Sequence, residues 1–164
     1  MSDVGLLDDD AIELAVAAID AWIAHWLADG SFLLAAERQV VTDGTASHQW
    51  YLRFAGEEKD VITVWATLRQ RTLFTEAQML PAPEANVEEV LGYLMRCNAE
   101  LYGMAYALGP EDAIYLMGRT SAIGLDEESL DRIFGSAVHY LDAHFVQAAS
   151  LGFPDWRRKR RRRS

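Results

Sequence analysis

The sequence predicts an α+β fold in which helices pack on one face of an antiparallel sheet. Two segments, 10–29 and 126–152, repeat apolar residues at helical spacing. Several segments between positions 48 and 119 alternate apolar and polar residues or are rich in β-branched ones. The connections between these segments are short and contain Gly, Pro or charged residues, which is typical of antiparallel neighbours.

The first predicted helix runs from about Asp10 to Asp29 and ends at Gly30. Its apolar stripe consists of Ile12, Val16, Ile19, Ile23 and Trp26, widened by Ala15 and Trp22. The opposite face is largely alanine. Either the helix is covered on more than one side, or alanine is there because it is the best helix former. The following residues, 31–46, fit a short helical turn or an extended segment equally well.

Three strands are predicted next, as a meander: His48–Phe54, Val61–Leu68 and Thr72–Leu80. The middle one is apolar on both faces apart from its threonines, which favours a central strand. Trp50 shares a face with His48, Leu52 and Phe54. If helices leave that face uncovered, it is an apolar patch available to a partner.

A second helix is predicted to open at Asn86, with Glu89 in capping-box position, and to end before Gly103. Strands Met104–Leu108 and Ala113–Arg119 follow, joined at Gly109-Pro110. The last helix extends from about Asp126 to Gly152. The predicted order is therefore α-β-β-β-α-β-β-α, with five antiparallel strands. Residues 1–153 form one domain, and residues 154–164 form a disordered basic tail.

Charge is distributed unevenly along the 164 residues. The net charge is −10, but residues 157–163, RRKRRRR, hold 7 of the 15 basic residues. The rest of the chain has 8 basic against 25 acidic residues, a net charge of −17. This acidic body is expected to repel nucleic acid and anionic membrane and to favour basic or amphipathic protein partners. The tail is expected to attract both anionic classes and the acidic body itself.

Composition favours a soluble cytoplasmic protein. The only cysteine is Cys97, which excludes an internal disulfide framework and fits a reducing compartment. The N-terminus lacks the basic-then-apolar pattern of a signal peptide. No apolar run is expected to approach the roughly 20 residues that span a bilayer.

The sequence contains none of the common catalytic or cofactor-binding motifs, so we expect no catalytic residue, no cofactor and no metal site. The sequence has no G-x-S-x-G elbow, P-loop or G-x-G-x-x-G. No two of the four histidines are four residues apart, the spacing that places two ligands on one helix face. His144 falls on the apolar stripe of the last helix, where a packed, hydrogen-bonded imidazole is expected. Arg119 is expected to pair with a carboxylate such as Asp131.

Residues 47–153 resemble the actinobacterial branch of the YbjN family, which shares the fold of type III secretion chaperones. The matching residues are Asn98, Leu101, Tyr102, Gly103, Ala107, Leu108, Ile114, Tyr115, Leu116, Gly118, Arg119, Glu127, Asp131, Leu151, Gly152 and Phe153. The resemblance implies a small acidic protein, often dimeric, that binds segments of other polypeptides and performs no chemistry. The basic tail lies outside it.

Two functional hypotheses follow. In the first, a homodimer holds a segment of another protein, and the candidate contacts are Trp22, Trp26, Trp50, Leu52 and Trp65. In the second, the tail binds nucleic acid or acidic lipid through Arg157, Arg158, Lys159, Arg160, Arg161, Arg162 and Arg163. A solvated tail without a specific partner is the alternative to the second.

Overall fold

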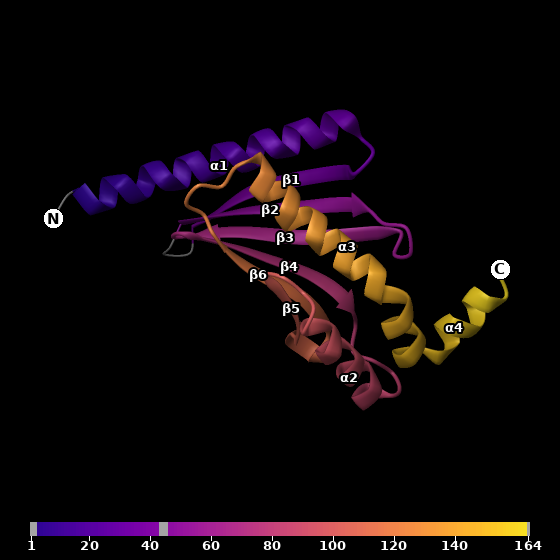
Figure 1. Cartoon of the computed structure of the whole chain (residues 1–164). Coiled ribbons are helices and arrows are strands. Elements are labelled where there is room, and N and C mark those ends of the chain that lie inside the picture. Colours follow the sequence, from indigo (N-terminus) through magenta and orange to yellow (C-terminus); the bar gives the residue numbers. More distant parts are fainter. Residues whose placement is uncertain (1–2, 43–45, 164) are drawn as a thin grey trace.

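The chain folds as one antiparallel sheet with helices against one of its faces (Figure 1). The computed structural model describes residues 3–42 and 46–163. The elements are α1 (Asp3–Asp29), β1 (Leu33–Thr42), β2 (Ala46–Ala55), β3 (Val61–Arg69), β4 (Thr72–Leu80), α2 (Val87–Asn98), β5 (Met104–Leu108), the 3₁₀ turn η1 (Pro110–Asp112), β6 (Ile114–Ser121), α3 (Glu127–Gly152) and α4 (Pro154–Arg161).

The sheet has six strands in the order β1-β2-β3-β4-β6-β5, rather than the five predicted. The extra strand is β1, which occupies most of the ambiguous segment 31–46. It pairs with β2, for example Ala36 with Leu52 and Arg38 with Trp50, and a bulge lies between Leu33 and Ala35. The fold class agrees with the prediction, and so does the remaining element order apart from η1 and the additional helix α4.

Helices α1 and α3 cover the face of the sheet that carries the core (Figure 1). Strand β3 shows the pattern clearly, because its alternate residues Ile62, Val64, Ala66 and Leu68 are buried. The prediction that this is a central strand is confirmed, because β3 lies between β2 and β4. Its other face carries Thr63, Trp65 and Thr67, of which Trp65 is exposed.

The helix ends follow from local hydrogen bonds. Helix α3 begins next to Asp126, where its start was predicted, and the Asp126 carboxylate caps it by accepting a hydrogen bond from the Ser129 N–H at 2.8 Å. The predicted capping box at Asn86 is wrong. Asn86 adopts a left-handed conformation with φ 52° and makes no side-chain cap. Its amide instead donates to the Leu151 carbonyl at 2.9 Å, which ties the start of α2 to the end of α3.

Helix α1 is longer than predicted. By length and composition alone its segment Asp9–Asp29, with mean hydropathy 1.4, would also suit a membrane-crossing helix. The expectation that no apolar run approaches this length is therefore wrong for α1. A mostly buried core helix and a signal sequence pass the same test. In this fold 22% of the segment is buried, including the side chains of Ala15, Ile19 and Trp22.

Candidate functional site

The five predicted contact residues divide into a buried group and one exposed residue. Trp50 and Leu52 are 1% and 0% exposed, because α1 covers the face of the sheet on which they lie. The Trp50 indole N–H donates to Asp20 of α1 at 2.8 Å. Helices do cover this face, so the condition for an apolar patch on it is not met, and the candidate contacts Trp50 and Leu52 belong to the core.

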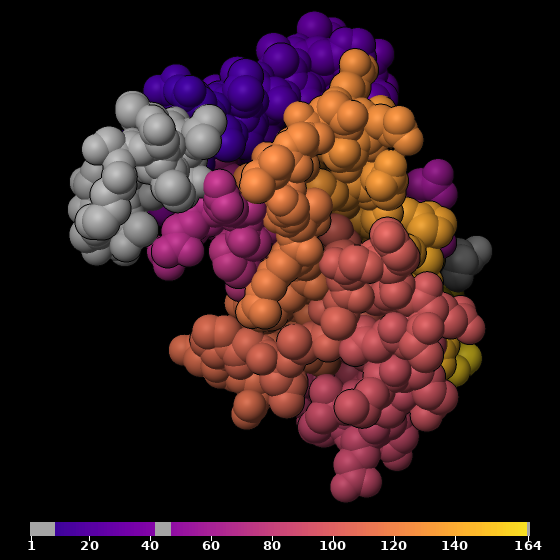
Figure 2. All heavy atoms as spheres, turned by 60° about the vertical axis from the view of Figure 1, so that its left-hand side comes forward, coloured from indigo at the N-terminus to yellow at the C-terminus, as the bar shows by residue number. Residues whose placement is uncertain are grey.

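Trp22 and Trp26 join α1 to α3. Their indole N–H groups donate to the Asp131 carboxylate at 2.8 and 3.3 Å, and the Trp22 ring lies 4.7 Å from that of Phe134. In Figure 2 the start of α3, in orange, lies against α1, in indigo. Trp22 is buried and Trp26 is half-buried, so both side chains pack inside the fold. The proposed Arg119–Asp131 pair does not form, since Asp131 faces the two tryptophans.

The remaining residue, Trp65, lies on the opposite face of the sheet, which we call the open face. Register places Tyr51, Trp65, Glu76 and Met117 side by side across β2, β3, β4 and β6. The Tyr51 and Trp65 rings are 5.4 Å apart in an edge-to-face arrangement. Trp65 is 39% exposed. A large aromatic side chain is therefore presented to solvent from the middle of the sheet.

Beside Trp65 the open face forms a groove of about 800 Å³. Its lining includes Thr67, Arg69, Phe74, Glu76, Met117 and Arg119. The Arg119 guanidinium lies 5.6 Å from the centre of the Phe74 ring, a cation–π distance. The groove thus combines an aromatic and a thioether surface with both signs of charge.

The open face is less acidic than the rest of the body. Its exposed charged residues are Glu37, Arg53, Arg69, Glu76 and Arg119, three basic and two acidic, on a body whose net charge is −17. This concentration of arginines was not predicted. Alternation within β2, β3 and β6 could have revealed it, because Arg53, Arg69 and Arg119 occupy outward positions.

His144 on α3 is a packed, hydrogen-bonded residue, as predicted. His144 Nδ1 lies 2.8 Å from the Tyr106 hydroxyl, which also donates to the Tyr140 carbonyl at 3.0 Å. Burial, followed by the nearby charge of His139, lowers the pKa of His144. Burial likewise raises the pKa of Tyr106. Within residues 3–42 and 46–163, no cluster of three or more His, Cys, Asp or Glu side chains could hold a metal ion.

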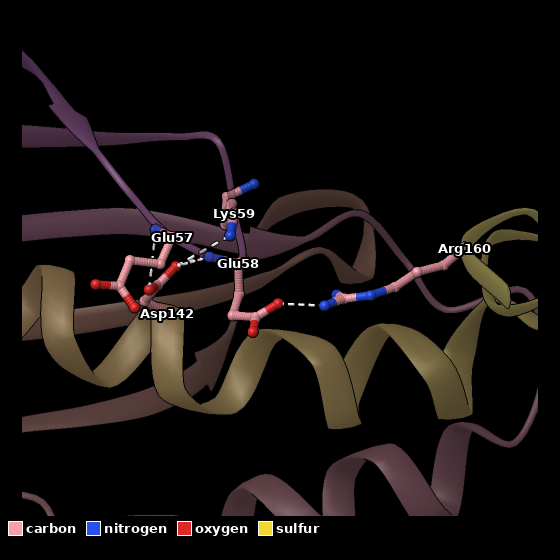
Figure 3. Close-up of polar contacts among 5 residues, drawn as sticks. All are labelled: Glu57, Glu58, Lys59, Asp142 and Arg160. Carbon is pink, nitrogen blue, oxygen red and sulfur yellow. Dashed lines mark hydrogen bonds and ion pairs between the residues drawn. The ribbon is translucent and has the colours of Figure 1, made fainter. Parts of the chain in front are cut away.

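The basic tail is a helix in this structure, where disorder was predicted. Helix α4 begins one residue after α3 ends, and Phe153 both ends α3 and precedes α4. The Trp156 ring lies 5.5 Å from that of Phe145 on α3, edge to face. Arg160 pairs with Glu58 in the turn between β2 and β3 (Figure 3). Part of the tail is thus attached to the acidic body.

One family model matches residues 19–149 of this chain, that of YbjN, described as "Putative bacterial sensory transduction regulator". Proteins of Mycobacterium tuberculosis H37Rv and Mycobacterium bovis, both named as uncharacterised, are 31% identical over 110 residues, which is 67% of this chain. The chain spans 60% of the length of those relatives. An uncharacterised protein of Mycobacterium leprae is 26% identical over 84% of this chain and 82% of its own length.

Among solved structures, a match comes from the heterodimeric complex ExoU-SpcU of the type III secretion system of Pseudomonas aeruginosa. The TM-score is 0.50 and the sequence identity 13%, over 83% of this chain and 98% of the matched chain. The likeness at this identity concerns the fold. It confirms the predicted type III secretion chaperone-like architecture.

Proposed function

Because the chain belongs to the YbjN family, whose model matches residues 19–149, we propose that it is a non-enzymatic regulatory or chaperone-like module that binds a segment of another polypeptide. The binding surface is the open face of the sheet. The matched complex from Pseudomonas aeruginosa is heterodimeric, which supports a polypeptide as the kind of partner. The observation that carries the proposal is the groove beside the exposed Trp65.

The chemistry of the groove defines the partner segment. Phe74 and Met117 favour apolar side chains, and Trp65 at its side offers a large aromatic surface. Arg69 and Arg119 favour a carboxylate. We therefore expect a segment that alternates apolar side chains with at least one Asp or Glu. The net charge of the body favours basic or amphipathic partners, and this segment is amphipathic and acidic because the open face carries three arginines and two glutamates.

The test is selection of peptides from a random library displayed on phage, with the full-length protein as bait. Enriched peptides should combine apolar and acidic residues. Their affinity should fall at least about tenfold in Trp65→Ala and in Arg119→Gln, the effect of losing a contact worth about 1.4 kcal/mol. Met95→Ala is the matched control, because Met95 is a 75% exposed apolar residue on α2. Failure to enrich any peptide, or enrichment insensitive to Trp65 and Arg119, would refute the proposal.

We further propose that the protein acts as a homodimer in the cytoplasm. Strand β1 lies at one edge of the sheet and exposes Leu34 and Val40, which supports edge pairing with a second copy. The free thiol of Cys97 supports a reducing compartment. Light scattering after size-exclusion chromatography tests whether the protein is a homodimer, and a monomeric mass at every concentration would contradict it. Cell fractionation tests the cytoplasmic location, and recovery of the protein in the membrane fraction would contradict it.

A further inference from the structure

Helix α4 is fixed to the body along one side only. Trp156 and Arg160 are four residues apart and therefore lie on the same side of the helix. Trp156 packs against Phe145, and the Arg160 guanidinium lies 5.4 Å from the centre of the Trp156 ring. Arg160 also pairs with Glu58 (Figure 3). These contacts set the direction in which the rest of the helix faces.

The turn that carries Glu58 is itself held in place. The Asp142 carboxylate on α3 accepts hydrogen bonds from the backbone N–H groups of Glu57, Glu58 and Lys59 at 3.1, 2.9 and 3.0 Å (Figure 3). A side chain at Gly56 would place its Cβ 2.0 Å from the Lys59 carbonyl oxygen, so only glycine fits there. Arg160 is thus anchored to a constrained turn, and α4 to a fixed position.

The side of α4 that faces away from the body is mostly cationic and carries one carboxylate, that of Asp155. Residues 157–163 are all exposed and comprise six arginines and one lysine. At 100° per residue, Arg157, Arg158 and Arg162 lie well away from the side of Trp156. Arg158 makes only a 3.6 Å ion pair with Asp155, in which both side chains are more than 70% exposed. Such a pair contributes little and is readily exchanged.

We propose that α4 is a docking helix for double-stranded DNA. Arginine is suited to phosphate because its planar guanidinium donates two parallel hydrogen bonds. A helix of about 10–12 Å diameter fits the major groove of B-form DNA, which is about 12 Å wide. A membrane-surface helix needs an exposed apolar side. The aromatic side of α4 packs on α3 instead, so the contacts favour DNA over lipid.

The acidic body does not prevent this binding. At physiological ionic strength the Debye length is about 8 Å, so exposed charges further away are largely screened. Helix α4 lies at one end of the molecule, beyond the end of α3 (Figure 1). Asp155 belongs to α4 itself. The acidic residues Glu57, Glu58 and Asp142 line a pocket together with Arg160, and Glu58 already pairs with Arg160. The body therefore restricts DNA to this end and does not exclude it.

The test uses the full-length protein, a fluorescein-labelled DNA duplex and anisotropy over a salt series from about 50 to about 200 mM. The triple variant Arg157→Gln, Arg158→Gln, Arg162→Gln should bind at least about tenfold more weakly at low salt and lower the salt slope by about 3. Glutamine is a good helix former, so α4 should persist. The matched control, Arg71→Gln, Arg96→Gln, Arg132→Gln, makes the same charge change at exposed positions of the body.

We expect the control to bind like the unmodified protein, with an unchanged salt slope. Equal losses in both triple variants would show a response to net charge alone and would overturn the proposal. So would the absence of duplex binding. Vesicles of equal parts phosphatidylserine and phosphatidylcholine and poly-glutamate serve as competitors at matched charge. Competition by either as strong as that of unlabelled duplex would assign α4 to lipid or to acidic polypeptides instead.

Discussion

Replacing Asp20 with alanine should destabilise the protein, because Asp20 joins α1 to the first two strands. Its Oδ1 accepts the indole N–H of the buried Trp50 at 2.8 Å. Its Oδ2 pairs with Arg38 of β1 at 2.6 Å. The Arg38 guanidinium in turn lies 5.6 Å from the centre of the Trp50 ring. Removing the carboxylate therefore leaves a buried donor without its partner and a cation without its counter-charge.

The expected loss can be estimated contribution by contribution. An unsatisfied buried N–H costs about 1–3 kcal/mol. The Arg38 pair is more than one-third exposed, so solvent screening limits its contribution to about 0.5 kcal/mol. Alanine regains about 0.5 kcal/mol as a better helix former than aspartate. The net destabilisation is about 2 kcal/mol. With a urea m-value of about 2 kcal/mol/M, the unfolding midpoint should fall by about 1 M.

Asp20→Asn is the matched control for this prediction. The amide oxygen keeps the acceptor for Trp50 while the charge facing Arg38 is lost. We expect a destabilisation of about 0.5 kcal/mol, one quarter of the alanine effect, and hence a midpoint shift of about 0.25 M. Urea unfolding followed by tryptophan fluorescence measures both variants. Equal midpoints for the two variants, or an alanine variant as stable as the original, would show that the Trp50 hydrogen bond does not hold α1 in place.

Three further predictions concern packing and protonation. Gly118→Ala should destabilise the protein by about 1–3 kcal/mol, because the new Cβ would lie 2.7 Å from the Thr75 hydroxyl oxygen. Gly135→Ala should stabilise α3 by about 1 kcal/mol, because its Cβ would have no atom within 4 Å and alanine is the better helix former. Thermal melts that shift in the same direction for both variants would contradict this. The lowered pKa of His144 contributes stability that is complete above 6.5 and lost as pH falls below it, so His144→Gln should flatten the change in urea midpoint between about pH 7.5 and about pH 5.5. Partial burial of Asp142 acts to raise its pKa, but three backbone N–H donors outweigh it, and the pKa lies below 3.8. Asp142→Ala should therefore speed amide exchange in the turn 57–59 at neutral pH, where the carboxylate is ionised, and unchanged exchange would argue against the anchoring of this turn.

Most of the fold could be predicted because the long helices and strands show clear helical periodicity or strand alternation in their sequences. The sequence could not show whether the segment that forms β1 is a strand or a helical turn, and the reason is physical. Its sequence, LLAAERQVVT, contains Ala, Glu and Gln, which are not typical of strands. Pairing with β2 stabilises this segment as a strand, and that contact lies between residues up to 21 positions apart. Such pairing is not visible in local propensity.

The candidate site was harder to predict than the fold. Trp50 and Trp65 lie on adjacent strands and are equally apolar, so alternation alone cannot say which of them a helix covers. The answer comes from α1, whose Asp20 accepts a hydrogen bond from Trp50. Disorder was predicted for the tail on composition, which is typical of basic runs. Composition alone does not reveal that Trp156 packs against Phe145, which is the contact that holds the tail helix on α3.

The hydrogen bond between Trp22 and Asp131 has a consequence for biosynthesis. It joins residues 109 positions apart, so α1 leaves the ribosome long before its partner helix exists. At about 5–20 residues per second, the interval lasts roughly 5–20 s. Throughout it the growing chain exposes the apolar faces of α1 and of the first four strands. The protein that we propose to bind segments of other polypeptides therefore passes through a stage in which its own chain is prone to aggregation. A chain truncated before α3 should remain in this aggregation-prone state.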